Sequence, residues 1–150
     1  MLLPTLRTLF NRDLERLIKE MEGYHDERNL WVTDKNIANA GGNLCLHLIG
    51  NLNTYFGAVL ARTGYIRNRE LEFSKKDVPA ATLISQVREA AVLVDTTLAG
   101  MSEEDLDKEY PLLVFENKMS TGYFLVHLAT HLAYHLGQVN YHRRLLDINH

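Results

Sequence analysis

The stretch HLATHLAYHLGQVNYH, residues 127–142, contains four of the seven histidines of the chain. Three of them, His127, His131 and His135, recur at intervals of four residues. Because an α-helix turns about 100° per residue, side chains four residues apart lie within about 40° of each other. The stretch therefore predicts a helix, from about residue 120 to 146, that carries a row of imidazoles along one side.

Three further segments upstream have the apolar periodicity of a one-sided helix. They cover about residues 4–22, 43–62 and 79–100, and Asn43 is expected to cap the second. The charged segment RNRELEFSKKD between the second and third is expected to be a loop. Four helices without an internal repeat pack most simply around one core. The sequence thus predicts a single all-α domain over residues 1–150, a four-helix bundle with one long connection between helices 1 and 2.

Composition limits the class of protein. Apolar residues make up 46% of the chain and charged residues 23%, which is ordinary for a globular domain. A net charge of −3 without a basic block argues against nucleic-acid binding. No apolar run is long enough to predict a signal peptide or a membrane span. The single cysteine, Cys45, is expected to be buried and suits a reducing cytoplasm.

Two histidines of the last helix are candidate metal ligands. His131 and His135 project from one face and can both reach one cation, whereas His127 lies about 80° from His135 and is a rival ligand. A site of this kind needs a third ligand from elsewhere. His47, in the apolar segment NLCLHLIGNLNTYF, is expected to point inward and to supply it. The alternative is that His47 is a hydrogen-bonded core histidine and that the pair lies at the surface.

Further polar residues accompany these histidines. Asn51 lies one turn beyond His47, and Gln138 lies one turn beyond His135. Because buried polar groups must be hydrogen-bonded or ligated, Gln138, Asn51 and Tyr55 could orient a ligand ring or a bound water. Gln138 could equally make a hydrogen bond between packed helices.

The remaining polar residues are not expected to take part. His142, next to Arg143 and Arg144, suits the negative end of the helix, and His25 and His150 are expected to be exposed. The sequence offers no general base, so no catalytic residue is assigned. The acidic residues of the loops are expected to be solvated: Glu70, Glu72, Asp77, Glu103, Glu104 and Asp105.

HLATHLAYHLGQ, together with the upstream GGNLCLHLIGNLNTYF, resembles the DinB-like superfamily of bacterial four-helix proteins. Its members are described as metal-dependent hydrolases, and relatives include thiol-dependent S-transferases. The resemblance spans nearly the whole chain and implies that His47, His131 and His135 hold a divalent ion. Leu136 stands where many members carry Arg before Gly-Gln. The family also implies a homodimer formed through helix faces.

Three functions are compatible with these residues. The first is a metal-dependent enzyme, a hydrolase or a transferase using a small cellular thiol, in which zinc or nickel, or else iron or manganese, activates water or a thiolate. The second is a non-catalytic module in which the metal is structural. The third is a dimeric helical scaffold whose histidines belong to the core. The sequence favours the first.

Overall fold

The computed structural model describes residues 1–148, so the expectation that His150 is exposed falls outside it. The regular secondary structure of the described residues is entirely helical, without a strand, and there is one isolated bridge between Glu109 and Ser120. The predicted all-α class is confirmed. The α-helices are α1 (Leu2–Gly23), α2 (Gly41–Leu52), α3 (Arg69–Ser74), α4 (Ala80–Ala99) and α5 (Thr121–Leu146). Two short 3₁₀-helices, η1 (Glu27–Trp31) and η3 (Glu103–Asp107), and one π-helix, η2 (Asn53–Ala61), accompany them.

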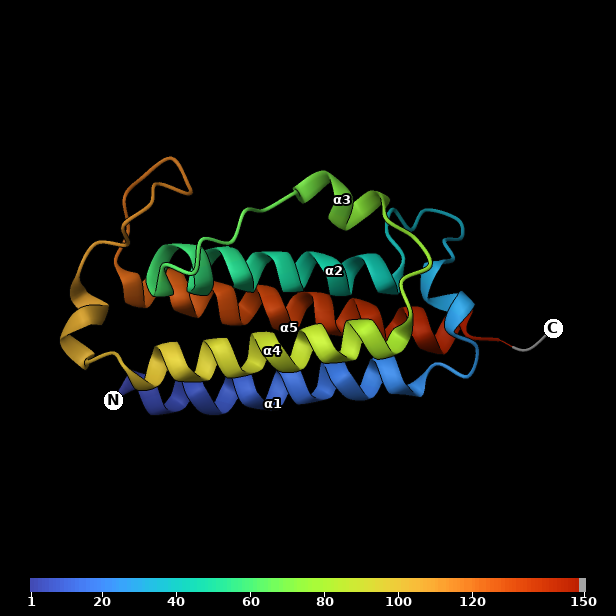
Figure 1. The fold of residues 1–150 in the computed structure, drawn as a ribbon, viewed down its shortest axis with the longest axis horizontal. Helices are drawn as coiled ribbons and strands as arrows, with labels where there is room; N and C mark the ends of the chain where they lie inside the picture. The colour runs from blue at the N-terminus through green and yellow to red at the C-terminus, as the bar shows by residue number, and fades with distance from the viewer. Residues whose placement is uncertain (149–150) are drawn as a thin grey trace.

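The four longer helices lie side by side, and the short α3 lies across the outside of α2 (Figure 1). α1 packs against α4 and α5, and α2 packs against the same two helices. The two faces that α4 and α5 turn toward α1 and α2 are apolar, as the periodicity predicted. The fully buried large side chains include Leu6, Phe10, Leu14, Leu17, Leu48, Leu52, Phe56, Leu83 and Phe124. Burying each such side chain contributes about 1.5–3 kcal/mol.

The second helix differs from the prediction at its start, whereas its expected end near Arg62 is confirmed. It begins at Gly41 rather than at Asn43, and Asn43 is a buried residue of its first turn instead of its cap. From Asn53 the helix widens into the π-helical η2, which ends at Arg62 in the left-handed region (φ 53°). The side chains of Asn53 and Thr54 donate to the carbonyls of Ile49 and Gly50, at 2.9 and 2.8 Å. These bonds satisfy acceptors where the backbone pattern changes.

The segment expected to be a charged loop contains α3, so the described residues hold five α-helices rather than four. Asn68 caps α3 by accepting from the backbone N–H of Leu71 at 3.2 Å. The Asn43 side chain donates to the carbonyls of Glu72 and Lys75, at 3.0 and 2.8 Å, which fixes α3 on α2. The long connection expected between the first two helices is present as residues 24–40. Residues 62–79 and 100–120 form connections of similar length, so the four longer helices are joined by three long connections rather than by one.

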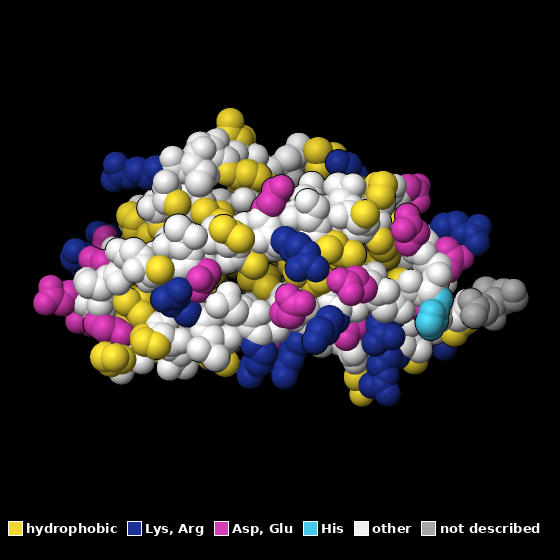
Figure 2. Space-filling view, turned by 60° about the horizontal axis from the view of Figure 1, so that its bottom comes forward, with side chains coloured by type: hydrophobic (Ala, Val, Ile, Leu, Met, Phe, Trp, Pro, Cys, Tyr) yellow, Lys and Arg dark blue, Asp and Glu magenta, His cyan; other side chains and the backbone are white. Residues whose placement is uncertain are grey.

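One continuous helical stretch, Gly41–Ala61, is long and apolar enough to cross a membrane by length and composition. Its most apolar window is 56% buried by the rest of the chain, which is what a core helix of a globular domain shows. On the face drawn in Figure 2, acidic and basic side chains are interspersed, with apolar patches between them.

Candidate metal centre

The three histidines singled out by spacing come together between α2 and α5. His47 lies in α2 and is buried, whereas His131 and His135, in α5, are half-buried. One nitrogen from each ring lies within 4.8 Å of the others. α2 packs against α5, so His47 and His131 lie close together although they are 84 positions apart in the sequence.

The geometry of these rings fits one divalent ion. Nε2 of His47 and Nε2 of His131 are 3.2 Å apart. Two nitrogens bound to one ion at 2.0–2.1 Å, with bond angles from octahedral to tetrahedral, lie about 2.8–3.4 Å apart. The ring centroids of His47 and His135 are 5.1 Å apart, and those of His131 and His135 are 4.5 Å apart. Each of the three could therefore supply one ligand.

The electrostatics of the site favour the neutral form of two of the rings, those of His47 and His131. Burial, together with the neighbouring rings of His135 and His47, lowers the pKa of His131 to about 3. Burial also lowers the pKa of His47, and it outweighs the opposite effect of Glu72. A neutral imidazole keeps the lone pair that a metal ligand needs, so neither His47 nor His131 has to release a proton before it binds an ion.

Two hydrogen bonds turn ring nitrogens toward the centre of the site. Nδ1 of His135 lies 2.7 Å from Oε1 of Gln138, which can only accept, so Nδ1 carries the proton. Nδ1 of His47 lies 3.0 Å from Oε1 of Glu72 and donates to it in the same way. In both rings the proton is therefore on Nδ1, and Nε2 is left as the acceptor.

The expectation that Glu72 is solvated is wrong. Its side chain is only 7% exposed, because α3 places it against α2 beside His47. Arg67 donates to both of its carboxylate oxygens, at 2.9 and 3.0 Å. The sequence signals that could have found it are Asn68, a capping residue that starts a helix inside the charged segment, and Gly50, which leaves room on α2.

Asn51 and Tyr55, two of the residues expected to support the ligands, do not hydrogen-bond to the three histidines. Asn51 is buried, and its Oδ1 has no partner within the described chain. The same holds for Nδ1 of His131 on the facing helix. The ring of Tyr55 packs edge-on against Phe124, with centroids 5.0 Å apart.

The other histidines of α5 lie outside the three-histidine group. The ring of His127 is half-buried, 6.2 Å from that of His131, and packs between Phe115 and Phe124. The sequence suggested that His142 interacts with the negative end of the helix, and this expectation is wrong. His142 is buried, and its Nε2 donates to the carbonyl of Val32 at 2.7 Å. Cys45 is buried as expected, and burial raises the pKa of its thiol to about 12.

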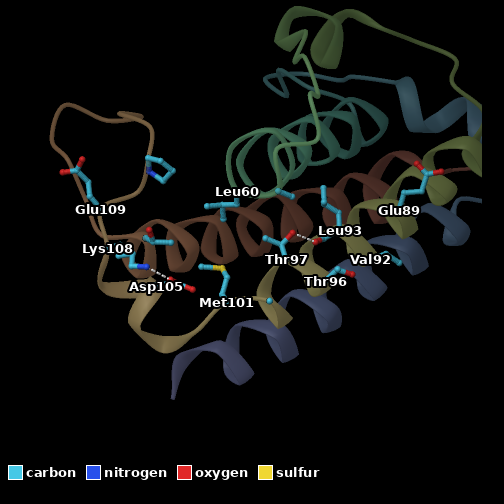
Figure 3. A pocket seen from close by; sticks show the side chains of 14 residues that line it. Leu60, Glu89, Val92, Leu93, Thr96, Thr97, Met101, Asp105, Lys108 and Glu109 are labelled. Carbon is cyan, nitrogen blue, oxygen red and sulfur yellow. Dashed lines mark hydrogen bonds and ion pairs between the residues drawn. The ribbon is translucent and has the colours of Figure 1, made fainter.

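A large cleft lies elsewhere on the described chain (Figure 3). It has a volume of about 860 Å³ and is formed by α4, the end of η2, η3 and the start of α5. Its walls are mainly apolar, with Leu60, Leu93 and Met101 facing it and the Asp105–Lys108 ion pair at its rim. It contains none of the three histidines, so its size does not mark the metal centre.

The sequence model of DUF1572, a family of proteins of unknown function, matches residues 3–150. The chain belongs to the DUF1572 family. The match includes all three histidines together with Glu72. No curated protein matches the chain at a significant level. The description of DUF1572 assigns no activity.

Proposed function

We propose that this DUF1572 protein is a divalent-metal-dependent enzyme of the DinB-like superfamily, either a hydrolase or a transferase that uses a small cellular thiol. In this proposal α1, α2, α4 and α5 form the four-helix bundle of that superfamily. The observation that carries the proposal is the convergence of His47, His131 and His135 to within 4.8 Å. Zinc and nickel suit three imidazoles best, and iron or manganese would also bind.

Three protein ligands fill three positions of an ion and leave at least one open, as in catalytic rather than structural zinc sites. A divalent ion held in this way supplies an activated nucleophile, drawn from water or from a thiol. His131 and His135 are half-buried rather than enclosed, so one side of the group faces solvent. This exposure favours an enzyme over a module in which the metal only stabilises the fold.

The surroundings of the histidines favour thiol chemistry over water chemistry. Glu72 bonds to Nδ1 of His47, the ring nitrogen on the far side from Nε2. A base at that place cannot take a proton from a nucleophile held on the Nε2 side of the ring. A thiol depends less on a base than water does, because its pKa of about 8.5 is already close to neutral.

Elemental analysis of protein purified without an affinity tag tests the proposal. We expect about one equivalent of a divalent metal per chain in the wild type and a large loss in His131→Ala. Activity is then measured on an ester, and on an activated aryl chloride with a low-molecular-weight thiol. Thiol-dependent chloride release that disappears with chelator would support the transferase. Unchanged metal content in His131→Ala would overturn the site.

We also propose that the chain is a cytoplasmic homodimer formed through α5. Tyr134, Tyr141 and Leu145 lie along one side of this helix and are 61–67% exposed. Gly137 lies on the same side, and a Cβ there would meet no atom within 4 Å. A glycine in an exposed helix is about 1 kcal/mol less stable than alanine, and close approach of a second helix is one use that accounts for it.

A further inference from the structure

Glu72 is a buried carboxylate for which the proposed chemistry has no direct use. A buried charge destabilises a fold unless it is paired and hydrogen-bonded. The Glu72 side chain is 7% exposed and meets both conditions through Arg67 and His47, which are themselves 17% and 7% exposed. All three therefore form one buried polar group at the junction of α2 and the 62–79 segment.

Two hydrogen bonds from Arg67 hold the carboxylate, and Asn43 and Gly50 fix its place on α2. Arg67 donates from Nε to Oε2 at 2.9 Å and from Nη2 to Oε1 at 3.0 Å, the two-pronged geometry that suits a guanidinium and a carboxylate. The Asn43 side chain holds the backbone carbonyl of Glu72 at 3.0 Å. Gly50 provides the space, because a Cβ at this position would overlap Oε2 of Glu72.

The fixed carboxylate determines how His47 is presented. Oε1 accepts from Nδ1 of His47 at 3.0 Å, which holds the proton on that nitrogen. Nη2 of Arg67 lies 3.4 Å from the same Nδ1, but two donors cannot bond to each other, so the shorter contact with Glu72 decides the tautomer. Nε2 is then free of hydrogen and faces Nε2 of His131 at 3.2 Å.

We propose that Glu72 is the positioning residue of the metal centre, acting through His47, and that Arg67 and Gly50 hold it in place. This inference rests on the proposed metal-dependent function and adds a residue outside the three-histidine set. A carboxylate behind a ligating imidazole fixes its orientation and raises its basicity, and removal of such a partner lowers metal affinity about 10–100-fold. Glu72 itself touches neither the metal nor a substrate.

The test compares Zn²⁺ affinity, by chelator competition, and the visible absorption of the Co²⁺-loaded protein. Glu72→Gln keeps the size of the side chain and removes its charge. Gly50→Ala changes no charge and pushes the carboxylate away from His47, so it gives an independent route if Glu72→Gln folds poorly. We expect about 10–100-fold weaker Zn²⁺ binding and an altered Co²⁺ spectrum in both variants.

Glu70→Gln is the matched control, because Glu70 is exposed on the same short helix and the charge change is identical. It should bind Zn²⁺ like the wild type. Wild-type protein that binds no Zn²⁺ would overturn the proposed function and this inference with it. Wild-type binding with equal affinity and an equal Co²⁺ spectrum in Glu72→Gln and Gly50→Ala would overturn the positioning role alone, even if thermal unfolding of the metal-free protein shifted.

Discussion

At the scale of single residues, the histidines of this chain divide by the partner that each ring finds. His47 and His135 donate from Nδ1 to a side-chain oxygen and keep Nε2 available. His142 has both nitrogens engaged. Nε2 donates to the carbonyl of Val32, so Nδ1 accepts from the hydroxyl of Tyr24 at 2.6 Å. An imidazole with both nitrogens occupied is a structural group, and its neutral form is the one that the fold requires.

We expect His142 to make stability depend on pH. Burial lowers its pKa in the folded state below the ordinary value of about 6.5, so the unfolded chain takes up the proton first. As pH falls below about 6.5 the unfolded state therefore binds more protons, and the free energy of unfolding decreases. Urea unfolding of metal-free protein at pH 7.5 and 5.5 measures this decrease.

His142→Gln should show a smaller decrease between the two pH values, because Gln does not titrate. Some decrease should remain, since the pKa values of His47 and His131 are also lowered. An identical decrease in wild type and variant would rule out a contribution from His142.

At the scale of secondary-structure elements, side chains from distant parts of the chain complete the helix ends. Residues Glu103–Asp107 form a single turn that begins with a capping box between Ser102 and Asp105. The same turn places Glu103 at the beginning of α1, where its carboxylate accepts from the backbone N–H groups of Leu2 and Leu3, at 3.2 and 3.1 Å. The Glu103 side chain, expected to be solvated, thus caps another helix.

We expect Glu103→Ala to lower the free energy of unfolding by about 1 kcal/mol, because it removes two hydrogen bonds and a negative charge from a helix N-terminus. Glu104→Ala is the matched control, since Glu104 is an exposed neighbour in the same turn and should change stability by less than about 0.5 kcal/mol. Chemical denaturation of both variants and of the wild type measures the two changes in the free energy of unfolding. Equal effects would show that Glu103 contributes no more than an ordinary surface charge.

At the scale of the whole molecule, the two faces of α5 differ in what covers them. One face packs against α1 and α2 and carries the histidines toward the interior. The other exposes the aromatic side chains of Tyr134 and Tyr141, 67% and 63% accessible. Large apolar surface on a helix of this length is typical of a protein–protein contact.

Tyr134→Lys and Tyr141→Lys together should shift the protein from dimer to monomer, because two like charges on each copy would face each other across a twofold contact. The molar mass from light scattering after size exclusion measures this shift. Val92→Lys on α4 is the matched control, since Val92 is 67% exposed on a different helix. A wild-type monomer, or a variant that stays dimeric, would contradict a contact through α5.

The sequence by itself determined the four longer helices and the histidine-bearing face of the last one. Apolar periodicity is a local property, and an interval of four residues places His131 and His135 on one side of any α-helix. The helix expected from about residue 120 to 146 is α5, Thr121–Leu146, in the structure. The choice of His47 as a third candidate also came from the sequence, because a polar residue in an apolar stretch needs a buried partner.

Only the tertiary structure decided which partners these residues meet. Judged from its own charged segment, Glu72 would be a solvated residue. Its burial depends on the nearby Arg67 and on two residues of α2, Asn43 and Gly50, the second of which has no side chain to block it. In the sequence His142 has the place of a helix-end residue, but in the structure its ring is buried and hydrogen-bonds to Tyr24 and Val32. The bonds of Asn43 to Glu72, of His142 to Val32 and of His142 to Tyr24 join positions 29, 110 and 118 residues apart, and partners at such separations are fixed by packing rather than by local periodicity.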